Sequence, residues 1–301
     1  MAEVFVVGSI NQDFVLKVER RPEPGETVTD AVLSTHHGGK GSNQAAAAAR
    51  LGAAVIMLGR VGEDEFGEPQ FVNLRDQGVD TSLIERLEGW KTGSAFITVT
   101  PDGENVITVA PGANRGLSDE DIEAAADAIA EAEILVAQME VSPETVAKAI
   151  EVAARVGTRV LVNLAPPFEV GRAFLAKLDP LVVNEHEAAF LLGEKVKGVE
   201  GALSAAPRLL ELGPRSAVVT LGAEGAVFAE GDSSGHLPAP LAKVVDTTGA
   251  GDAFVGALAV RLAQGAPLEE AVAYAARAGA AAVTREGAQG SLPTHAEIEA
   301  M

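Results

Sequence analysis

The stretch DTTGAGD (Asp246–Asp252) combines two carboxylates with two glycines immediately before a helix-forming run, AFVGALAVRLAQG. Backbone N–H groups at the start of a helix converge on anions, and the helix dipole adds positive charge there. The amides of Gly249, Ala250 and Gly251 are therefore candidates for holding a phosphate. Asp252 can be a simple helix N-cap, but beside a bound phosphate it is better explained as the group that accepts a proton from an attacking hydroxyl. The stretch favours a phosphoryl-transfer site.

A second glycine-rich stretch, GGKGSNQAAAAARLG, runs from Gly38 to Gly52 and leads into a helix. Several backbone N–H groups and Lys40 can converge there on a polar ligand. The alternative is a glycine-rich turn with a solvated lysine. The stretch matches neither a Walker A loop nor G-x-G-x-x-G, and the missing dinucleotide fingerprint disfavours a nicotinamide-dependent dehydrogenase.

Polar residues also follow two predicted strands. Asn11 and Asp13 come just after the first strand, where ligands bind in open α/β sheets, and they suit neighbouring sugar hydroxyls. A polar loop without function is the simpler explanation of that pair taken alone. Asn184 and Glu187 surround a helix start and offer oxygen ligands that hold magnesium through water. Ordinary helix capping explains Asn184 almost as well.

The segment VVTLGAEGAVF places Thr220, Gly222 and Gly225 between two predicted strands. A tight glycine turn allows the close approach of a nucleotide. A simple hairpin explains the pattern equally well.

These residues need a framework, and short apolar runs that alternate with helical stretches provide one. The runs are continuous rather than alternating, which is typical of parallel strands covered on both faces. We predict a doubly wound, three-layer α/β/α sandwich. The predicted strands are 3–8, 53–59, 133–138, 158–163, 180–184 and 216–221. The predicted helices are 43–51, 119–130, 143–156 and 202–212, and a strand is expected to enter Asp246.

Two regions, 14–33 and 94–110, instead alternate apolar and polar residues and turn at Pro-Gly and Asp-Gly. This pattern indicates antiparallel, half-exposed strands and hairpins. They predict a small β-sheet beside the main layers, which is either a flap that closes over a site or a plain surface hairpin.

The composition narrows the class of protein. Of the 301 residues, 47% are hydrophobic and 22% are charged, as in ordinary globular proteins. The formal charge of −20, with no run of Lys or Arg, argues against binding to nucleic acid. There is no cysteine, and we expect no membrane span, no signal peptide and a cytoplasmic location.

Taken together, the motifs resemble those of the ribokinase-like carbohydrate kinase family over essentially the whole chain. In chain order they are NQD at 11–13, GGKGSNQA at 38–45, APGAN at 110–114, NEHE at 184–187, DTTGAGD at 246–252 and VTREGAQGS at 283–291. The resemblance implies one kinase domain over 1–301, with a mixed central sheet and a β-sheet lid formed by about 12–37 and 91–110. It further implies a homodimer formed through the lid and transfer of the ATP γ-phosphoryl group to O5 of D-ribose.

The resemblance also implies roles for individual residues. Asp252 is the base, with the amides of Gly249, Ala250 and Gly251 as the anion hole. The implied sugar contacts are Asn11, Asp13, Gly38, Gly39, Lys40, Asn43, Glu140 and Asp252. The implied nucleotide contacts are Asn184, Thr220, Gly222, Ala223, Glu224, Gly225 and Gly251. Glu187 supports Mg²⁺ through water, and a K⁺ site takes ligands from Asp246, Thr248, Ala282, Arg285, Gly287 and Ser291.

Three alternatives stay open at this stage. A kinase of the same family that acts on fructose, 2-keto-3-deoxygluconate or a nucleoside is the nearest. A non-catalytic sugar or nucleotide sensor is the second, and the intact Asp252 argues against it. The dehydrogenase is the third.

Overall fold

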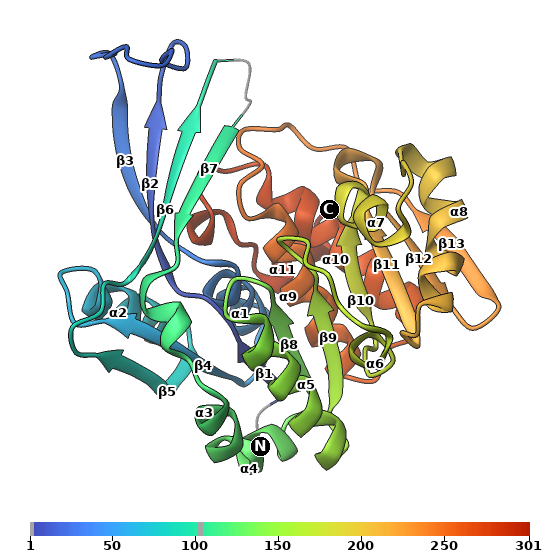
Figure 1. The fold of residues 1–301 in the computed structure, drawn as a ribbon. Coiled ribbons are helices and arrows are strands. Elements are labelled where there is room, and N and C mark those ends of the chain that lie inside the picture. The colour runs from blue at the N-terminus through green and yellow to red at the C-terminus, as the bar shows by residue number, and fades with distance from the viewer. Residues whose placement is uncertain (1–2, 102–104) are drawn as a thin grey trace.

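The computed structural model describes residues 3–101 and 105–301, and its largest feature is a nine-stranded sheet (Figure 1). The strand order is β13-β12-β11-β10-β9-β8-β1-β4-β5. All neighbouring pairs from β11 to β5 are parallel. The strands are β1 (Val4–Val7), β4 (Val55–Gly62), β5 (Val79–Leu87), β8 (Ile134–Gln138), β9 (Arg159–Asn163), β10 (Leu181–Asn184), β11 (Ser216–Thr220), β12 (Ala226–Glu230) and β13 (Ser233–Leu237).

Helices cover both faces of this sheet, which confirms the predicted three-layer α/β/α fold. In β1, Val4 and Val6 join one hydrophobic core while Phe5 and Val7 join the other, so a continuous apolar run is what the two-sided burial requires. One layer contains α1 (Lys40–Arg50), α2 (Gly67–Asp76), α9 (Ala250–Ala263), α10 (Leu268–Ala282) and α11 (His295–Glu299). The other contains α3 (Asp119–Ala124), α4 (Ala126–Ala130), α5 (Pro143–Val156), α6 (Arg172–Leu175), α7 (Glu185–Leu192) and α8 (Gly198–Glu211).

One edge of the sheet is antiparallel, as the hairpin interpretation of 218–228 and the implied mixed sheet predict. β12 runs antiparallel to β11 because the three-residue 3₁₀ turn η2 (Gly222–Glu224) is too short for a parallel crossover. β13 runs antiparallel to β12 after a two-residue turn at Gly231–Asp232. β5 was missing from the prediction. It is an edge strand whose burial alternates, so its sequence VDTSLIERL lacks a continuous apolar run.

A second sheet of four strands stands on one edge of the body, in the order β3-β2-β6-β7 (Figure 1). Its strands are β2 (Asn11–Lys17), β3 (Val32–Gly38), β6 (Gly93–Val99) and β7 (Asn105–Ala110). The alternating regions predicted this small sheet correctly. Region 14–33 forms an antiparallel pair, β2 and β3, with the predicted turn at Pro24-Gly25 between them. The proline- and glycine-containing segment 18–31 has no strand. The Asp-Gly turn at 102–103 lies outside the described residues.

Other predicted boundaries also need correction. The apolar run before Asp246 is no strand: Leu241, Val244 and Val245 are exposed and pair with no sheet. The single helix predicted over 119–130 is divided at Ala125 into α3 and α4. Helices α1 and α8 begin at Lys40 and Gly198, before the predicted starts. Among the described residues, no helix has the length and apolar character to cross a membrane.

Candidate active site

The site lies where the carboxyl ends of the central strands meet the starts of α1 and α9. A cavity of about 230 Å³ opens there. Its lining residues are Lys40, Asn163, Ala165, Val182, Asn184, Glu187, Thr220, Thr247, Gly249, Gly251, Asp252 and Val255.

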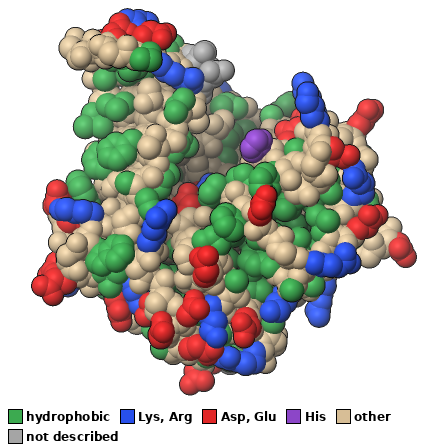
Figure 2. Space-filling view, viewed as in Figure 1, with side chains coloured by type: hydrophobic (Ala, Val, Ile, Leu, Met, Phe, Trp, Pro, Cys, Tyr) green, Lys and Arg blue, Asp and Glu red, His purple; other side chains and the backbone are tan. Residues whose placement is uncertain are grey.

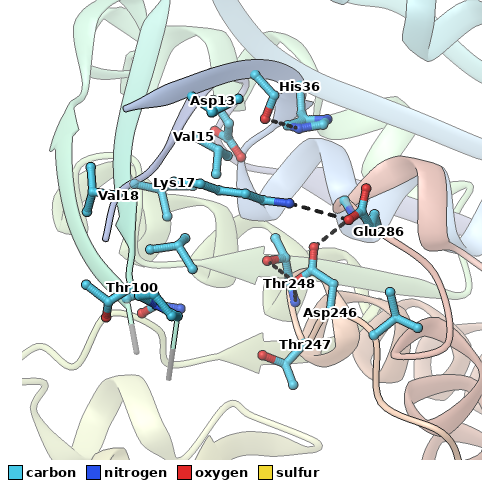
Figure 3. Close-up of a pocket in the computed structure, with 18 of the residues that line it drawn as sticks. Asp13, Val15, Lys17, Val18, His36, Thr100, Asp246, Thr247, Thr248 and Glu286 are labelled. Carbon is cyan, nitrogen blue, oxygen red and sulfur yellow. Dashed lines mark hydrogen bonds and ion pairs between the residues drawn. The ribbon is translucent and has the colours of Figure 1, made fainter. Parts of the chain in front are cut away.

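A larger cavity of about 610 Å³ separates the small sheet from loops of the body. In Figure 3, one side carries Asp13, Val15 and Lys17 of β2, and the other carries Asp246, Thr247, Thr248 and Glu286. A hollow between the small sheet and the body is also visible on the molecular surface (Figure 2).

Asp252 lies at the third position of α9, and its side chain is buried. Its Oδ2 accepts a hydrogen bond from Asn43 Nδ2 at 2.9 Å, and its Oδ1 accepts one from Gln44 Nε2 at 2.9 Å. Both donors come from α1, so the Asp252 carboxylate binds a neighbouring helix and does not cap its own. Burial raises the pKa of Asp252, against the opposing effect of Lys40 and the two amide donors.

The start of α9 supplies the amides that the sequence suggested. Gly249 precedes the helix with a φ of 77°, and a Cβ there would lie 2.9 Å from the Ala288 Cα, so only glycine fits without displacement. The first helical amides have no carbonyl one turn earlier within the helix. The Ala250 N–H makes a long bond of 3.3 Å to the Thr247 carbonyl, and Gly251 borders the smaller cavity. A 14-residue helix therefore directs its positive end at the space beside Asp252.

A second buried carboxylate, Asp13, lies close to Asp252. Asp13 is buried on β2, and its Oδ1 has no hydrogen-bond partner within residues 3–101 and 105–301. Gly38 packs so closely that a Cβ there would lie 2.0 Å from Asp13 Oδ2. Burial, together with the negative charges of Glu140 and Asp252, raises the pKa of Asp13 to about 7, although Lys40 lowers it. Buried polar groups normally find partners, so Asp13 Oδ1 is available to accept a hydrogen bond from a ligand.

Lys40 is the cation of this cluster. Its burial lowers the pKa, but four carboxylates outweigh that effect and keep its pKa above the usual value. Glu140 is one of the four, and its Oε2 also accepts the Lys40 backbone N–H at 3.1 Å and the Ser9 hydroxyl at 2.6 Å. Gly39 has a φ of 96° and lies against the backbone of residues 9–11, which brings the start of α1 to the end of β1.

Asn11 is held by Asn114, a residue of the APGAN motif for which the sequence predicts no separate role. Asn114 Nδ2 donates to Asn11 Oδ1 at 2.7 Å, and Asn114 Oδ1 accepts the Ile10 N–H at 2.9 Å. An added Cβ on Gly93 would lie 2.2 Å from both side chains. The APGAN motif therefore fixes the orientation of Asn11 across 103 residues of sequence.

Asn184 and Glu187 form a capping box at the start of α7, so the capping alternative holds for Asn184. Its Oδ1 accepts the Glu187 N–H at 2.9 Å, while Glu187 Oε2 accepts the Asn184 N–H at 2.8 Å. Both line the smaller cavity, and burial raises the pKa of Glu187. Because both carboxylate oxygens already accept hydrogen bonds, Glu187 suits a metal held through water rather than directly. No described cluster of three or more His, Asp or Glu residues forms a metal site.

The segment after β11 is a hairpin, as the second interpretation of its sequence had it. Thr220 borders the smaller cavity, and Gly222, Ala223 and Glu224 form η2. Gly225 has a φ of 91°, and a Cβ there would lie 2.1 Å from the Leu237 carbonyl oxygen. Close packing against the end of β13 thus explains Gly225 without a ligand.

The structure brings together three of the residues named for a K⁺ site. Asp246 accepts the Gly287 N–H at 2.9 Å on Oδ2, and the Thr248 N–H and hydroxyl at 2.9 and 2.7 Å on Oδ1. Although burial raises the pKa of Asp246, these hydrogen bonds hold it below its usual range, so the carboxylate stays charged. A charged carboxylate is an oxygen ligand that suits a hard cation, although both oxygens of Asp246 already accept hydrogen bonds.

The other three residues of that set lie in the adjoining segment. Ala282 ends α10, its carbonyl accepts the Arg285 N–H at 3.3 Å, and the Ser291 hydroxyl donates to the Ala288 carbonyl at 2.8 Å. The Val283 carbonyl accepts the Asp246 N–H at 3.3 Å, which joins this segment to Asp246.

Comparison with known proteins places these motifs in a family. Residues 1–295 match the family described as pfkB family carbohydrate kinase. The chain is 37% identical to a ribokinase of Schizosaccharomyces pombe, covering 99% of this chain and 97% of that protein. It is also 37% identical to a deoxyribokinase of Salmonella typhi, covering 97% and 96%. The structure of Arabidopsis thaliana ribokinase complexed with ribose and ATP matches with a TM-score of 0.89 at 31% identity, covering 99% and 98%.

The raised pKa of Asp13 predicts a dependence of stability on pH. Between pH 3.8 and about 7 the folded protein keeps a proton that the unfolded chain has released, so stability falls as the pH rises through this window. Asp13→Asn cannot ionise, and we expect it to raise the free energy of unfolding at pH 8 by up to about 4 kcal/mol.

Urea denaturation of the ligand-free protein at pH 4.5, 6 and 8 measures the effect, which should shrink towards the lowest pH. Asp30→Asn, at an exposed carboxylate of the same cavity, is the matched control and should leave stability nearly unchanged. An Asp13→Asn variant less stable than the parent at pH 8 contradicts the prediction.

Proposed function

The chain belongs to the pfkB family of carbohydrate kinases, and we propose that it transfers the γ-phosphoryl group of ATP to O5 of D-ribose, giving ribose 5-phosphate and ADP. The observation that carries the proposal is the buried Asp252 carboxylate at the positive end of α9, with the unpaired oxygen of Asp13 nearby. A sugar hydroxyl pairs with Asp13, and a phosphoryl group meets the helix amides.

The sugar is held by side chains that border the Asp13 carboxylate. Asp13 Oδ1 accepts a sugar hydroxyl, and Lys40 donates to sugar oxygens while balancing the surrounding carboxylates. The full set that we propose as sugar contacts is Asn11, Asp13, Gly38, Gly39, Lys40, Asn43, Glu140 and Asp252. Orientation by several fixed hydrogen bonds brings O5 within reach of Asp252.

Asp252 accepts the proton of O5 while that oxygen forms a bond to the γ-phosphorus. The bond from the γ-phosphorus to the bridging oxygen breaks, and ADP leaves with that electron pair. Burial raises the pKa of Asp252, which makes the carboxylate a stronger base than one in water. The amides of Gly249, Ala250 and Gly251 stabilise the charge on the transferring group because they point at it before the reaction begins.

The nucleotide occupies the smaller cavity and the neighbouring turn. The proposed contacts are Asn184, Thr220, Gly222, Ala223, Glu224, Gly225 and Gly251. Mg²⁺ neutralises phosphate charge when it is bound, and Glu187 supports its water shell. K⁺ adds positive field beside the anion hole when it is bound, with Asp246, Thr248, Ala282, Arg285, Gly287 and Ser291 as the proposed ligands.

We propose that residues 12–37 and 91–110, which contain most of the small sheet, form a lid. The lid belongs to a single kinase domain of residues 1–301. Strand alternation turns Asp13, Val15 and Lys17 towards the cavity, so the intervening side chains face outwards. We place the reaction in the cytoplasm, where ATP is available.

ADP release across a substrate panel tests the function. D-Ribose, 2-deoxy-D-ribose, D-fructose, 2-keto-3-deoxygluconate and adenosine are compared with Mg²⁺ and ATP, first in KCl and then in NaCl. We expect ribose to be among the best substrates and KCl to give the faster rate. Turnover of another sugar but not of ribose contradicts the proposed substrate and leaves the proposed kinase activity standing. No ADP with any substrate favours a sensor.

Asp252→Asn should lower kcat by roughly 10²- to 10⁴-fold, the range expected for the loss of a general base. ATP binding, measured by titration calorimetry, should change little, because the helix amides remain. Asp232→Asn, in an exposed turn after β12, is the control and should keep the parent rate. A near-normal rate in Asp252→Asn contradicts the role of Asp252 as the general base.

We also propose that the lid joins two chains as a homodimer. Its outward face is apolar: Leu33 is 57% exposed, Phe96 46% and Val106 45%, and Figure 2 shows hydrophobic side chains on this sheet. Phe96→Glu places a charge in that face and should shift the protein towards monomer in sedimentation velocity. Phe168→Glu, at a 45% exposed phenylalanine away from the lid, should not. A monomeric parent protein contradicts the proposal.

A further inference from the structure

Gln289 is a buried residue for which the proposed reaction has no use. It begins the 3₁₀ turn η3 (Gln289–Ser291), and its amide is held at both ends. Its Nε2 donates to Asn43 Oδ1 at 3.1 Å and to Ser42 Oγ at 3.2 Å. Its Oε1 accepts a hydrogen bond from Asn73 Nδ2 on α2 at 2.5 Å.

Asn43 links Gln289 to Asp252, the proposed base. Asn43 receives a hydrogen bond from Gln289 at Oδ1 and donates from Nδ2 to Asp252 Oδ2 at 2.9 Å. The amides of Asn73, Gln289 and Asn43 therefore all donate in the same direction, towards Asp252. The two ends of an amide are nearly equal in shape but opposite in hydrogen-bonding character. Because Gln289 presents a donor to Asn43 Oδ1, Asn43 is left with its donor for Asp252.

The direction of this chain decides which form of Asp252 is favoured. A donor facing the carboxylate stabilises the ionised form, which can accept a proton, whereas a carbonyl oxygen in the same place favours the protonated form. The second donor, Gln44, is fixed in the same way, since its Oε1 accepts from Gln138 Nε2 at 2.7 Å. The charged groups that act on Asp252 from other elements are Lys40 on α1, Glu140 after β8 and Asp13 on β2.

We propose that Gln289 is a positioning residue that holds the Asn43 amide in its donating orientation and so keeps Asp252 ionised for proton transfer. The inference rests on the proposed function of Asp252 as the base. It differs from a purely structural role, because filling the space of Gln289 with an apolar side chain preserves packing but loses the direction of the amide.

The pH dependence of kcat/KM for the sugar tests this role. Gln289→Glu replaces the donor with an acceptor, which favours reversal of Asn43, and Gln289→Met keeps the length but offers no donor. We expect the acid limb of the profile to move upwards by about 1 pH unit in Gln289→Glu and by less in Gln289→Met, the size expected for one hydrogen bond to a charged group. At a pH below the limb this lowers kcat/KM about 10-fold, while KM for ATP stays within about 2-fold.

Asn73→Asp provides a second test at a residue that does not contact Asp252. An acceptor at this position favours reversal of Gln289 and, through it, of Asn43, so the acid limb should move in the same direction by a smaller amount. Gln264→Glu, exposed near the end of α9, adds the same charge to the helix of Asp252 and should leave the limb in place.

Titration of the Asp252 carboxyl carbon by ¹³C NMR in the ligand-free variants measures the same shift without turnover. It therefore separates this inference from the proposed function, which fails if the parent protein releases no ADP with any sugar. Equal loss of kcat/KM at every pH, with an unmoved carboxyl titration in both Gln289 variants, overturns the positioning role and leaves Gln289 as a packing residue. A shifted titration in folded Gln289→Met or Asn73→Asp supports it.

Discussion

The close approach of α1 and α9 is the constraint on which the site depends. A Cβ added to Gly256 would lie 2.5 Å from Ala47 Cβ and 2.9 Å from the Gln44 carbonyl oxygen, so the two helices meet through their smallest residues. At this distance the amides of Asn43 and Gln44 reach Asp252 on the neighbouring helix. The run of alanines in α1 is therefore more than a helix-forming sequence. It allows a buried carboxylate to accept hydrogen bonds from two neutral amides, and burial still raises its pKa although Lys40 opposes this.

Unfavourable electrostatics around Asp13 follow from the same packing. Asp13 and Glu140 lie near Asp252, and Lys40 is the cation that acts on all three. Burial beside like charges raises the pKa of Asp13, and one of its oxygens lacks a partner in the described part of the chain. A ligand hydroxyl placed there relieves an existing penalty, whereas a ligand without it leaves the oxygen unpaired. Sites built in this way discriminate strongly between ligands that differ by one hydroxyl.

The sequence predicted what depends on short-range patterns. Six buried strands and the three-layer fold follow from continuous apolar runs, and the helix after DTTGAGD begins where glycines and Asp252 indicate. Local pattern failed where burial alternates, as in β5, and where apolar residues stay exposed, as in Val244 and Val245. Local patterns also cannot predict hydrogen bonds between residues that are distant in sequence. Gln44 and Gln289 are ordinary polar residues until the fold places them next to Asp252 and Asn43, 208 and 246 positions away.

Helix α2 shows how such distant contacts combine. Gln70 and Asn73 lie three residues apart and therefore on one face of the helix. Gln70 binds Gln12 at the root of the small sheet at 3.0 Å and also contacts His37, while Asn73 binds Gln289. Breaking the buried Gln70–Gln12 contact leaves amide groups unpaired, at a cost of about 1–3 kcal/mol, and the part-buried Asn73–Gln289 contact costs less. The root of the small sheet and the amide chain that ends at Asp252 are consequently fixed to the same helix, so a displacement of α2 strains both ends of the site together.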